Sequence, residues 1–336
     1  MIAQFFDQYS RYEQILAPIQ LAFFMLGMGV TLTLGDFGRM VRRPQAVLMG
    51  AACQFLLSPL IALLIIHLFN LEPGIKIGLV LISAMPSGSL PKLFSYFGRG
   101  NLVLSASLDA FGTMVSLVSV PLLMGLVVAD YLPDFEVPFG LVMTHLILFL
   151  VSPLLIGMAL ARMWPRPRQI ISKWCFRIGA AIVAVMIIGS VGSGRASPFT
   201  HGWQPLVAVI LFCILSQQLS MRPFRLLKWP RADRLSIGLD VTMRNINLAL
   251  AILAIMRQTL ERQQVPGLGK LDPKVNGTLD NVFWAILVYA AAAAVAGFLV
   301  ALQFRNAPSD PNAQTIMTDP PAPDVAEAAA IQVSKI

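Results

Sequence analysis

The chain has 336 residues, of which 57% are hydrophobic and only 12% are charged, and its formal net charge is +8. Because a soluble globular domain carries about 25% charged residues, this composition excludes a soluble protein and indicates an all-α polytopic membrane protein. The basic residues lie in short clusters between apolar runs, which is typical of topology signals rather than of nucleic-acid binding.

The cysteines and the motif content argue against metal and enzyme chemistry. Cys53, Cys175 and Cys213 each lie inside an apolar run, where cysteine packs as a small hydrophobe. They predict neither a disulfide framework nor a thiolate metal site. The sequence contains no recognisable nucleophile and base pair, phosphate loop or metal-ligand spacing, so we do not expect an enzyme.

In chain order, residues 1–14 predict a short interfacial segment, since no basic region precedes an apolar core as in a signal peptide. A bilayer is crossed by about 20 apolar residues, and residues 15–304 are predicted to form a transmembrane region of nine helices. The nine apolar runs are 15–34, 46–69, 75–97, 102–128, 139–163, 170–191, 205–219, 235–256 and 282–304. Residues 305–336, rich in Pro, Ala, Asp and Ser, predict a disordered cytoplasmic tail.

Charge in the connections predicts the orientation in the plasma (inner) membrane. Basic clusters follow the first, third, fifth and seventh runs, whereas the connection after the fourth run is acidic. By the positive-inside rule, the N-terminus is expected outside and the C-terminus in the cytoplasm. Residues 257–274, expected to form an external loop, depart from the pattern, because they hold four basic residues against two acidic ones.

The third and eighth runs are predicted to be interrupted helices. Pro86, Gly88 and Pro91 stand in the third run just before Lys92, and proline opens a helix by removing a backbone donor. Opened backbone at membrane depth is tolerated where it faces protein or a watery cavity, and the lysine favours a cavity. The eighth run contains the polar stretch Gly238–Asn247. Two interrupted spans in corresponding halves indicate a transporter site at the midplane of an inverted repeat.

Four ionisable residues lie well inside predicted spans: Lys92, Asp109, Asp240 and Arg244. Each costs about 2.5 to 3.5 kcal/mol at a helix centre, so all are expected to face the interior and to be paired. Asp240 and Arg244 share one face if their helix is continuous. Two purely structural ion pairs are the competing interpretation.

Several collinear motifs resemble the bile acid:sodium symporter family, in a bacterial-type form with altered sodium sites. FMLGMGVTLTLGDF (residues 24–37) looks like the first-span signature, and ACQFLLSPL (52–60) like the Gln-Phe-x-x-x-Pro segment. MPSGSLPKLFSYFGRGNLVLSASLD (85–109) matches the broken helix with its following turn and span, and LDVTMRN (239–245) the Glu-x-Gly-x-Gln-Asn element.

The resemblance implies a core domain from residues 46–128 and 205–304 and a panel domain from residues 15–34 and 139–191. The two broken helices would cross at the centre of the core. A small organic anion would bind between the domains and be carried by alternating access, with two sodium ions bound at the crossing. The partners implied are the lipid bilayer and this anion; the substrate, the direction of transport and the oligomeric state stay open.

Carried over residue by residue, the resemblance places altered side chains at both sodium sites. In the first site the family's Ser-Asn pair falls on Pro91 and Lys92, its serine on Ser105, its threonine on Asp109 and its glutamate on Asp240. In the second site the glutamine is kept as Gln54, the glutamate is again Asp240, and a second glutamine has become Arg244. Asn245, which the family places facing substrate, is kept; Ser89 and Thr242 either contact substrate or satisfy opened backbone.

These substitutions lead to a hypothesis of sodium independence without any cofactor. Lysine and arginine side chains offer only hydrogen-bond donors, whereas sodium needs oxygen ligands. Lys92 with Asp109 and Asp240 would replace the first ion, and Arg244 with Asp240 and Gln54 the second. Proton coupling, exchange and facilitated diffusion stay open as the mode of transport. The alternatives are a conventional sodium-coupled symporter and a membrane receptor or scaffold that keeps the fold without transport.

Overall fold

The structure is a computed structural model in which residues 9–32, 35, 44–88, 90–125, 139–164, 166–192, 202–264 and 272–306 are described. Almost all of these residues are helical. Several regions named above lie outside them: Ser89, the basic cluster after the first run, the acidic connection after the fourth run, residues 265–271 of the expected external loop and the expected tail beyond Asn306. Most of the expected interfacial segment, residues 1–8, also lies outside.

Seven helical units within the described residues are long and apolar enough to cross a membrane. Five of them are single α-helices, and each of the other two contains a short π-helical segment. The seven are α2 (Tyr9–Thr31), α4–η1–α5 (Pro44–Ala52, Cys53–Leu57, Ser58–Leu68), α8 (Leu102–Leu123), α10–η3–α11 (Phe139–His145, Leu146–Val151, Ser152–Met163), α12 (Arg168–Gly192), α13 (Trp203–Leu226) and α16 (Pro273–Asn306).

Two further spans are each built from a pair of shorter helices, as the sequence predicts. The third consists of α6 (Pro73–Ala84) and α7 (Leu90–Phe97), and the eighth of α14 (Arg231–Thr242) and α15 (Ile246–Gln264). Together with the seven uninterrupted units they confirm a polytopic all-α protein with about nine spans. Pro91 stands at the second position of α7, where a missing backbone N–H costs nothing. Of the three helix-breaking residues named above, only Pro86 and Gly88 therefore lie between α6 and α7.

The second half of the eighth span, α15, is longer than its hydropathy indicates. Arg257 was expected in an external loop, but it lies inside α15 with 1% of its surface exposed. Its guanidinium Nη2 lies 2.9 Å from Asp280 Oδ1 of α16, and its Nη1 donates to Asn276 Oδ1 at 2.5 Å. Because this charge is buried and paired, it does not act as a topology signal, and the predicted external loop loses one of its basic residues.

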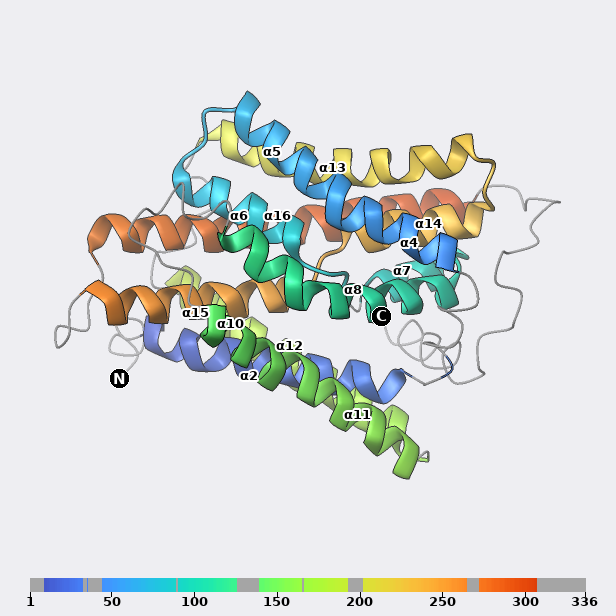
Figure 1. Ribbon diagram of the computed structural model, residues 1–336, viewed down its shortest axis with the longest axis horizontal. Coiled ribbons are helices and arrows are strands. Elements are labelled where there is room, and N and C mark those ends of the chain that lie inside the picture. Colours follow the sequence, from blue (N-terminus) through green and yellow to red (C-terminus); the bar gives the residue numbers. More distant parts are fainter. Residues whose placement is uncertain are drawn as a thin grey trace.

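The helices pack in two groups (Figure 1). In one group, α2 packs against α11 and α12. In the other, α16 packs against α6 and α13, and α14 packs against α13, α8 and α7. The helix α15 belongs to an interrupted span and also lies along α2, so it joins the two groups. The interrupted spans therefore lie beside the boundary between the groups.

Candidate functional site

The two interruptions cross each other and share backbone hydrogen bonds. Gly88 N donates to Met243 O at 3.0 Å, and Asn245 N donates to Pro86 O at 2.8 Å. Ser87 and Arg244 accordingly form an isolated antiparallel bridge. An opened helix in a membrane must satisfy its freed backbone groups within the protein. Here each interruption satisfies groups that the other has freed.

Thr242 and Asn245 support the backbone at this crossing. Thr242 Oγ1 donates to Gly238 O at 2.7 Å, and its carbonyl accepts a hydrogen bond from the Tyr289 hydroxyl of α16. Asn245 Oδ1 accepts from Leu248 N at 3.1 Å, which caps the start of α15. Both residues are buried. These side-chain hydrogen bonds satisfy backbone at helix ends, which is one of the two roles that the sequence left open for Thr242.

Lys92 and Asp109 form an ion pair beside the crossing. Lys92 Nζ, in the first turn of α7, lies 2.5 Å from Asp109 Oδ2 of α8. The other carboxylate oxygen, Oδ1, accepts a hydrogen bond from the Ser87 hydroxyl in the interruption. The Asp109 side chain is 0% exposed and that of Lys92 is 18% exposed. The pair thus ties the second half of the third span to the span that follows it.

Asp240 lies near this pair, at the end of α14. Ser105 Oγ donates to Asp240 Oδ1 at 3.1 Å, and the carboxylate interacts electrostatically with Asp109 and with Lys92. Asp240 is fully buried, and among the described residues its Oδ2 has no hydrogen-bond partner. One ammonium group therefore lies in the field of two buried carboxylates.

Arg244 reaches two backbone carbonyls from different spans. Its Nη1 donates to Met85 O at 2.9 Å and its Nη2 donates to Gln54 O at 3.0 Å. Met85 follows the last residue of α6, so the guanidinium lies at the carbonyl end of that helix, where a positive charge is stabilised. The guanidinium occupies oxygen atoms of the kind that would otherwise coordinate a cation.

The Gln54 carbonyl is available because of a proline five residues later. In η1 the backbone bonds run from residue i to residue i−5, and Ser58 N donates to Cys53 O. The next bond of this series would run from residue 59 to Gln54 O, but Pro59 has no N–H. Arg244 supplies the missing donor.

In the fifth span, the carbonyl that a corresponding Ser-Pro step leaves without a donor finds one nearby in the same helix. Ser152 N donates to Ile147 O across η3, and Pro153 follows. There the Ser152 hydroxyl donates to Leu148 O at 2.7 Å and fills the gap left by the proline. Ser58 does not do the same, since its buried hydroxyl has no hydrogen-bond partner among the described residues. The second span therefore leaves its carbonyl to a side chain from the eighth span.

Two of the expected contacts are absent. Asp240 and Arg244 are both described and form no ion pair, and α14 ends at Thr242, so the two do not share one continuous helix face. The Gln54 side-chain amide was expected near Arg244, but within the described residues neither of its polar atoms has a hydrogen-bond partner. Arg244 contacts the backbone of that residue instead.

Three participants were not identified from the sequence. The Met85 carbonyl and the Tyr289 hydroxyl carry no local motif, and the hydrogen bond from Ser87 to Asp109 was not expected. The spacing of Gln54 and Pro59 is a signal that was present in the sequence. The described residues contain no group of three or more His, Cys, Asp or Glu side chains that could hold a metal ion.

A narrow apolar crevice lies where the two packed groups meet. Residues of α2, α10, η3 and α15 line it, and its volume is about 10 Å³. On α2, Gln20 Nε2 donates to Asn247 O at 3.1 Å, and Gln14 Nε2 donates to Glu261 Oε2 at 2.8 Å. The N-terminal part of α2 is thus held against α15, from just beyond the crossing to the far end of that helix.

Comparison with known proteins agrees with this architecture. Residues 18–197 match the model of the Sodium Bile acid symporter family. The chain is 27% identical to "Uncharacterized sodium-dependent transporter YocS" of Bacillus subtilis, over 70% of this chain and 72% of that protein.

Relatives from plants and animals show a similar likeness. The chain is 28% identical to "Probable sodium/metabolite cotransporter BASS1, chloroplastic" of Arabidopsis thaliana, over 70% of this chain but only 58% of that protein. It is 25% identical to "Ileal sodium/bile acid cotransporter" of Oryctolagus cuniculus, over 70% of this chain and 68% of that protein. With more than half of its length matched by the family model, the chain belongs to the Sodium Bile acid symporter family, which consists of membrane transporters and not of enzymes.

Proposed function

We propose that the chain is a secondary transporter that carries a small organic anion across the plasma (inner) membrane by alternating access without binding sodium. The observation that carries the proposal is Arg244, whose guanidinium donates to carbonyls of the second and third spans. The N-terminus faces outward and the C-terminus lies in the cytoplasm. The core consists of residues 46–128 and 205–304, and the panel of residues 15–34 and 139–191.

In the first ion position, the ammonium group of Lys92 stands in for sodium. Its Nζ lies 2.5 Å from Asp109 Oδ2, so the two charged groups are in direct contact. Asp240, bonded to Ser105, adds a second carboxylate to the same field. Lysine contributes only donors, so an added cation at this position would be repelled by the Lys92 ammonium group.

In the second ion position, Arg244 takes the carbonyl oxygens of Met85 and Gln54. A bound cation and a guanidinium compete for the same oxygen atoms. Arginine cannot be deprotonated in a protein, so this charge is permanent through the transport cycle. The site is therefore satisfied in every conformation in which the crossing stays intact.

The charges near the crossing cancel without an added ion. Lys92 and Arg244 are positive, and Asp109 and Asp240 are negative. A net charge left at membrane depth would be costly, about 2.5 to 3.5 kcal/mol for each uncompensated side chain. Two sodium ions added to this neutral set would leave two positive charges uncompensated. This argument favours sodium independence over a conventional symporter.

The substrate path follows the boundary between the core and the panel. In the conformation seen here, α2 is bonded to α15 through Gln14 and Glu261, and only a narrow crevice remains between α2, η3 and α15. With the N-terminus outside, this is the external side of the boundary, and it is closed. Alternating access then requires α2 and α15 to separate so that the anion enters or leaves on that side.

The decisive test compares sodium with other monovalent cations. The purified protein is melted in equal concentrations of sodium, potassium and choline chloride. Equal melting temperatures at all concentrations are the expected result, because both cation positions are already filled by side chains. A saturable increase in melting temperature that is specific to sodium would overturn the proposal and favour the sodium-coupled symporter that the names of the relatives suggest.

Uptake into proteoliposomes separates a transporter from a receptor with the same fold. Small carboxylates and amphipathic organic anions are tested for uptake without sodium, with and without an imposed pH gradient. Accumulation that follows the gradient identifies proton coupling, and equilibration alone identifies exchange or facilitated diffusion. A ligand that changes the reactivity of a cysteine introduced beside Asn245, yet is never taken up, would show a non-transporting receptor instead.

A further inference from the structure

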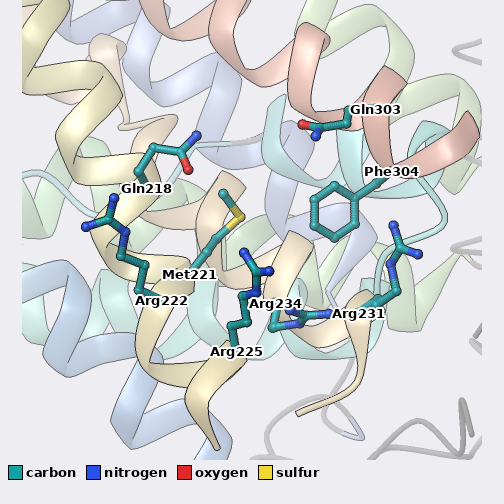
Figure 2. A pocket seen from close by; sticks show the side chains of 8 residues that line it. All are labelled: Gln218, Met221, Arg222, Arg225, Arg231, Arg234, Gln303 and Phe304. Carbon is teal, nitrogen blue, oxygen red and sulfur yellow. The ribbon is translucent and has the colours of Figure 1, made fainter. Parts of the chain in front are cut away.

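A cavity of about 460 Å³ lies away from the crossing, at the ends of three helices. Its lining comes from the end of α13, the start of α14 and the end of α16, as Figure 2 shows. The eight lining residues are Gln218, Met221, Arg222, Arg225, Arg231, Arg234, Gln303 and Phe304. Four of the eight are arginines, and none is acidic.

The nearest carboxylate in the sequence does not line the cavity. Asp233 stands between Arg231 and Arg234 but is fully buried, and its Oδ1 accepts a hydrogen bond from Asn101 Nδ2 at 2.8 Å. Arg231 lies over the ring of Phe304, with its Cζ 5.4 Å from the ring centroid. The concentration of positive charge in one cavity therefore creates a strong local potential for an anion. Guanidinium groups match phosphate oxygens in geometry as well as in charge.

The cavity lies at the ends of two spans beside exposed apolar side chains, which suits the headgroup of a lipid. The spans α13 and α16 both end beside it, at Leu226 and Asn306. Leu226, which follows Arg225, is 83% exposed, and Leu299, one turn before Gln303, is 58% exposed. Exposed leucines next to a cluster of arginines at the end of a span provide apolar surface for acyl chains and donors for the phosphate. By the charge rule this is the cytoplasmic side, where basic pockets between spans bind anionic lipids.

We propose that this arginine cavity binds the phosphodiester headgroup of an anionic phospholipid from the cytoplasmic leaflet. The headgroup lies among the four arginines of the cavity, and its acyl chains lie along Leu226 and Leu299. Because α14 begins at Arg231 and leads directly to the crossing, a lipid in the cavity would also tie the inner end of the eighth span to α13 and α16.

The test measures lipid binding to the full chain in detergent. The purified protein is titrated with cardiolipin, with phosphatidylglycerol, with phosphatidylcholine and with inorganic phosphate, and the melting temperature is followed. The variant carries Arg222→Gln and Arg225→Gln, which are exposed and lie outside the helix crossing. The matched control carries Arg162→Gln, in the last turn of α11, and Arg166→Gln, in the connection to α12; both positions are also exposed, and the control removes the same charge.

The expected result is a saturable increase in melting temperature with the two anionic lipids and none with phosphatidylcholine. The apparent affinity should fall by roughly 30-fold in the cavity variant, which loses two basic contacts near the membrane surface, and stay unchanged in the control. Equal responses of the two variants would overturn the proposal. Saturation by inorganic phosphate at the same concentrations would also overturn it, by showing a free-phosphate site rather than a lipid site.

Discussion

At the scale of single residues, the crossing is held by charged side chains with different kinds of partner. Lys92 is paired with a carboxylate, whereas Arg244 is bound to carbonyls. The two cations therefore contribute differently to stability. Removing the partner of a buried charge leaves that charge uncompensated. Removing a donor instead leaves neutral carbonyls without a hydrogen-bond partner, so that they can accept from water or bind a cation.

The first prediction concerns the buried ion pair. Asp109→Asn is expected to lower the free energy of unfolding by about 3 kcal/mol, because the Lys92 ammonium loses its direct partner. The double variant Lys92→Met with Asp109→Leu should recover most of this loss, since an apolar pair leaves no buried charge. Thermal unfolding in detergent measures both. If Asp109→Asn alone melts like the unaltered protein, Lys92 is not held by this carboxylate.

The second prediction concerns Arg244 and the freed carbonyls. Arg244→Gln is expected to introduce a sodium-dependent increase in melting temperature that the unaltered protein lacks, because Met85 O and Gln54 O lose their donors and become available to a cation. The measurement is a sodium titration against potassium. A matched control is Arg99→Gln, at an exposed position in the turn after α7. A variant that stays equally stable and insensitive to sodium would show that the carbonyls do not form a cation site.

At the scale of elements, the packing of α2 on α11 depends on one glycine in each helix, and each of the two glycines lies against the backbone of the other helix. A Cβ built on Gly29 would lie 2.1 Å from Leu154 O, and one built on Gly157 would lie 2.4 Å from Leu26 O. The obstructing atoms belong to backbone, which cannot move aside as a side chain can. Small residues at such positions let membrane helices approach closely.

The third prediction follows from this contact. Gly29→Ala is expected to destabilise the protein by roughly 1 to 3 kcal/mol, because the added methyl group forces α2 and α11 apart. Gly277→Ala in α16 is the control, since a Cβ there would meet no atom within 4 Å, and alanine favours a helix. Melting temperatures of the two variants should change in opposite directions or differ clearly. Equal melting temperatures would mean that the helices tolerate a larger separation.

The π-helical segments are the other feature decided at this scale. Each precedes a Ser-Pro step, at Pro59 or at Pro153. Proline removes one donor in both spans, yet a serine hydroxyl repairs the gap in the fifth span and a distant arginine repairs it in the second. The same local sequence therefore gives a closed helix in one place and a binding carbonyl in the other.

At the scale of the whole molecule, the proposed alternating-access cycle requires the two packed groups to move relative to each other. In that proposal, the contact between α2 and α15 is the joint that opens on the external side, and it includes the Gln14–Glu261 and Gln20–Asn247 hydrogen bonds. Neither bond joins two formal charges. Opening this joint therefore separates no pair of opposite charges at these two points, which suits a contact that must break in every cycle.

The fourth prediction locks this joint. Gln14→Cys with Glu261→Cys, joined by a short bifunctional thiol reagent, is expected to reduce uptake by at least about tenfold, because α2 and α15 can no longer separate. The control joins Phe24→Cys to Phe176→Cys, which lie within one packed group, with ring centroids 5.7 Å apart in the unaltered chain. Uptake should survive that link. Unchanged uptake in the locked protein would show that transport does not use this opening.

The spans themselves could be predicted closely from the sequence, and so could the places where two of them break. Hydropathy and proline act within one segment, so the apolar runs and the opening near Pro86 follow from local chemistry. The predicted end of the eighth span was less accurate, because a charged residue that is buried and paired can lie inside a helix. Arg257 looked like a loop residue because of its charge, yet Asp280 and Asn276 allow it to lie inside α15.

The sequence alone determined that this chain crosses a membrane in about nine helices, that the third and eighth are interrupted, and that buried cations stand near the interruptions. Only the tertiary structure decided which groups these cations contact. Arg244 and Gln54 are 190 residues apart. The Gln54 carbonyl can accept from Arg244 because Pro59 has no N–H to donate to it. Local propensity acts over a few residues, whereas the choice of a partner depends on which helices pack together; for this reason the Arg244 contacts could not be inferred from spacing.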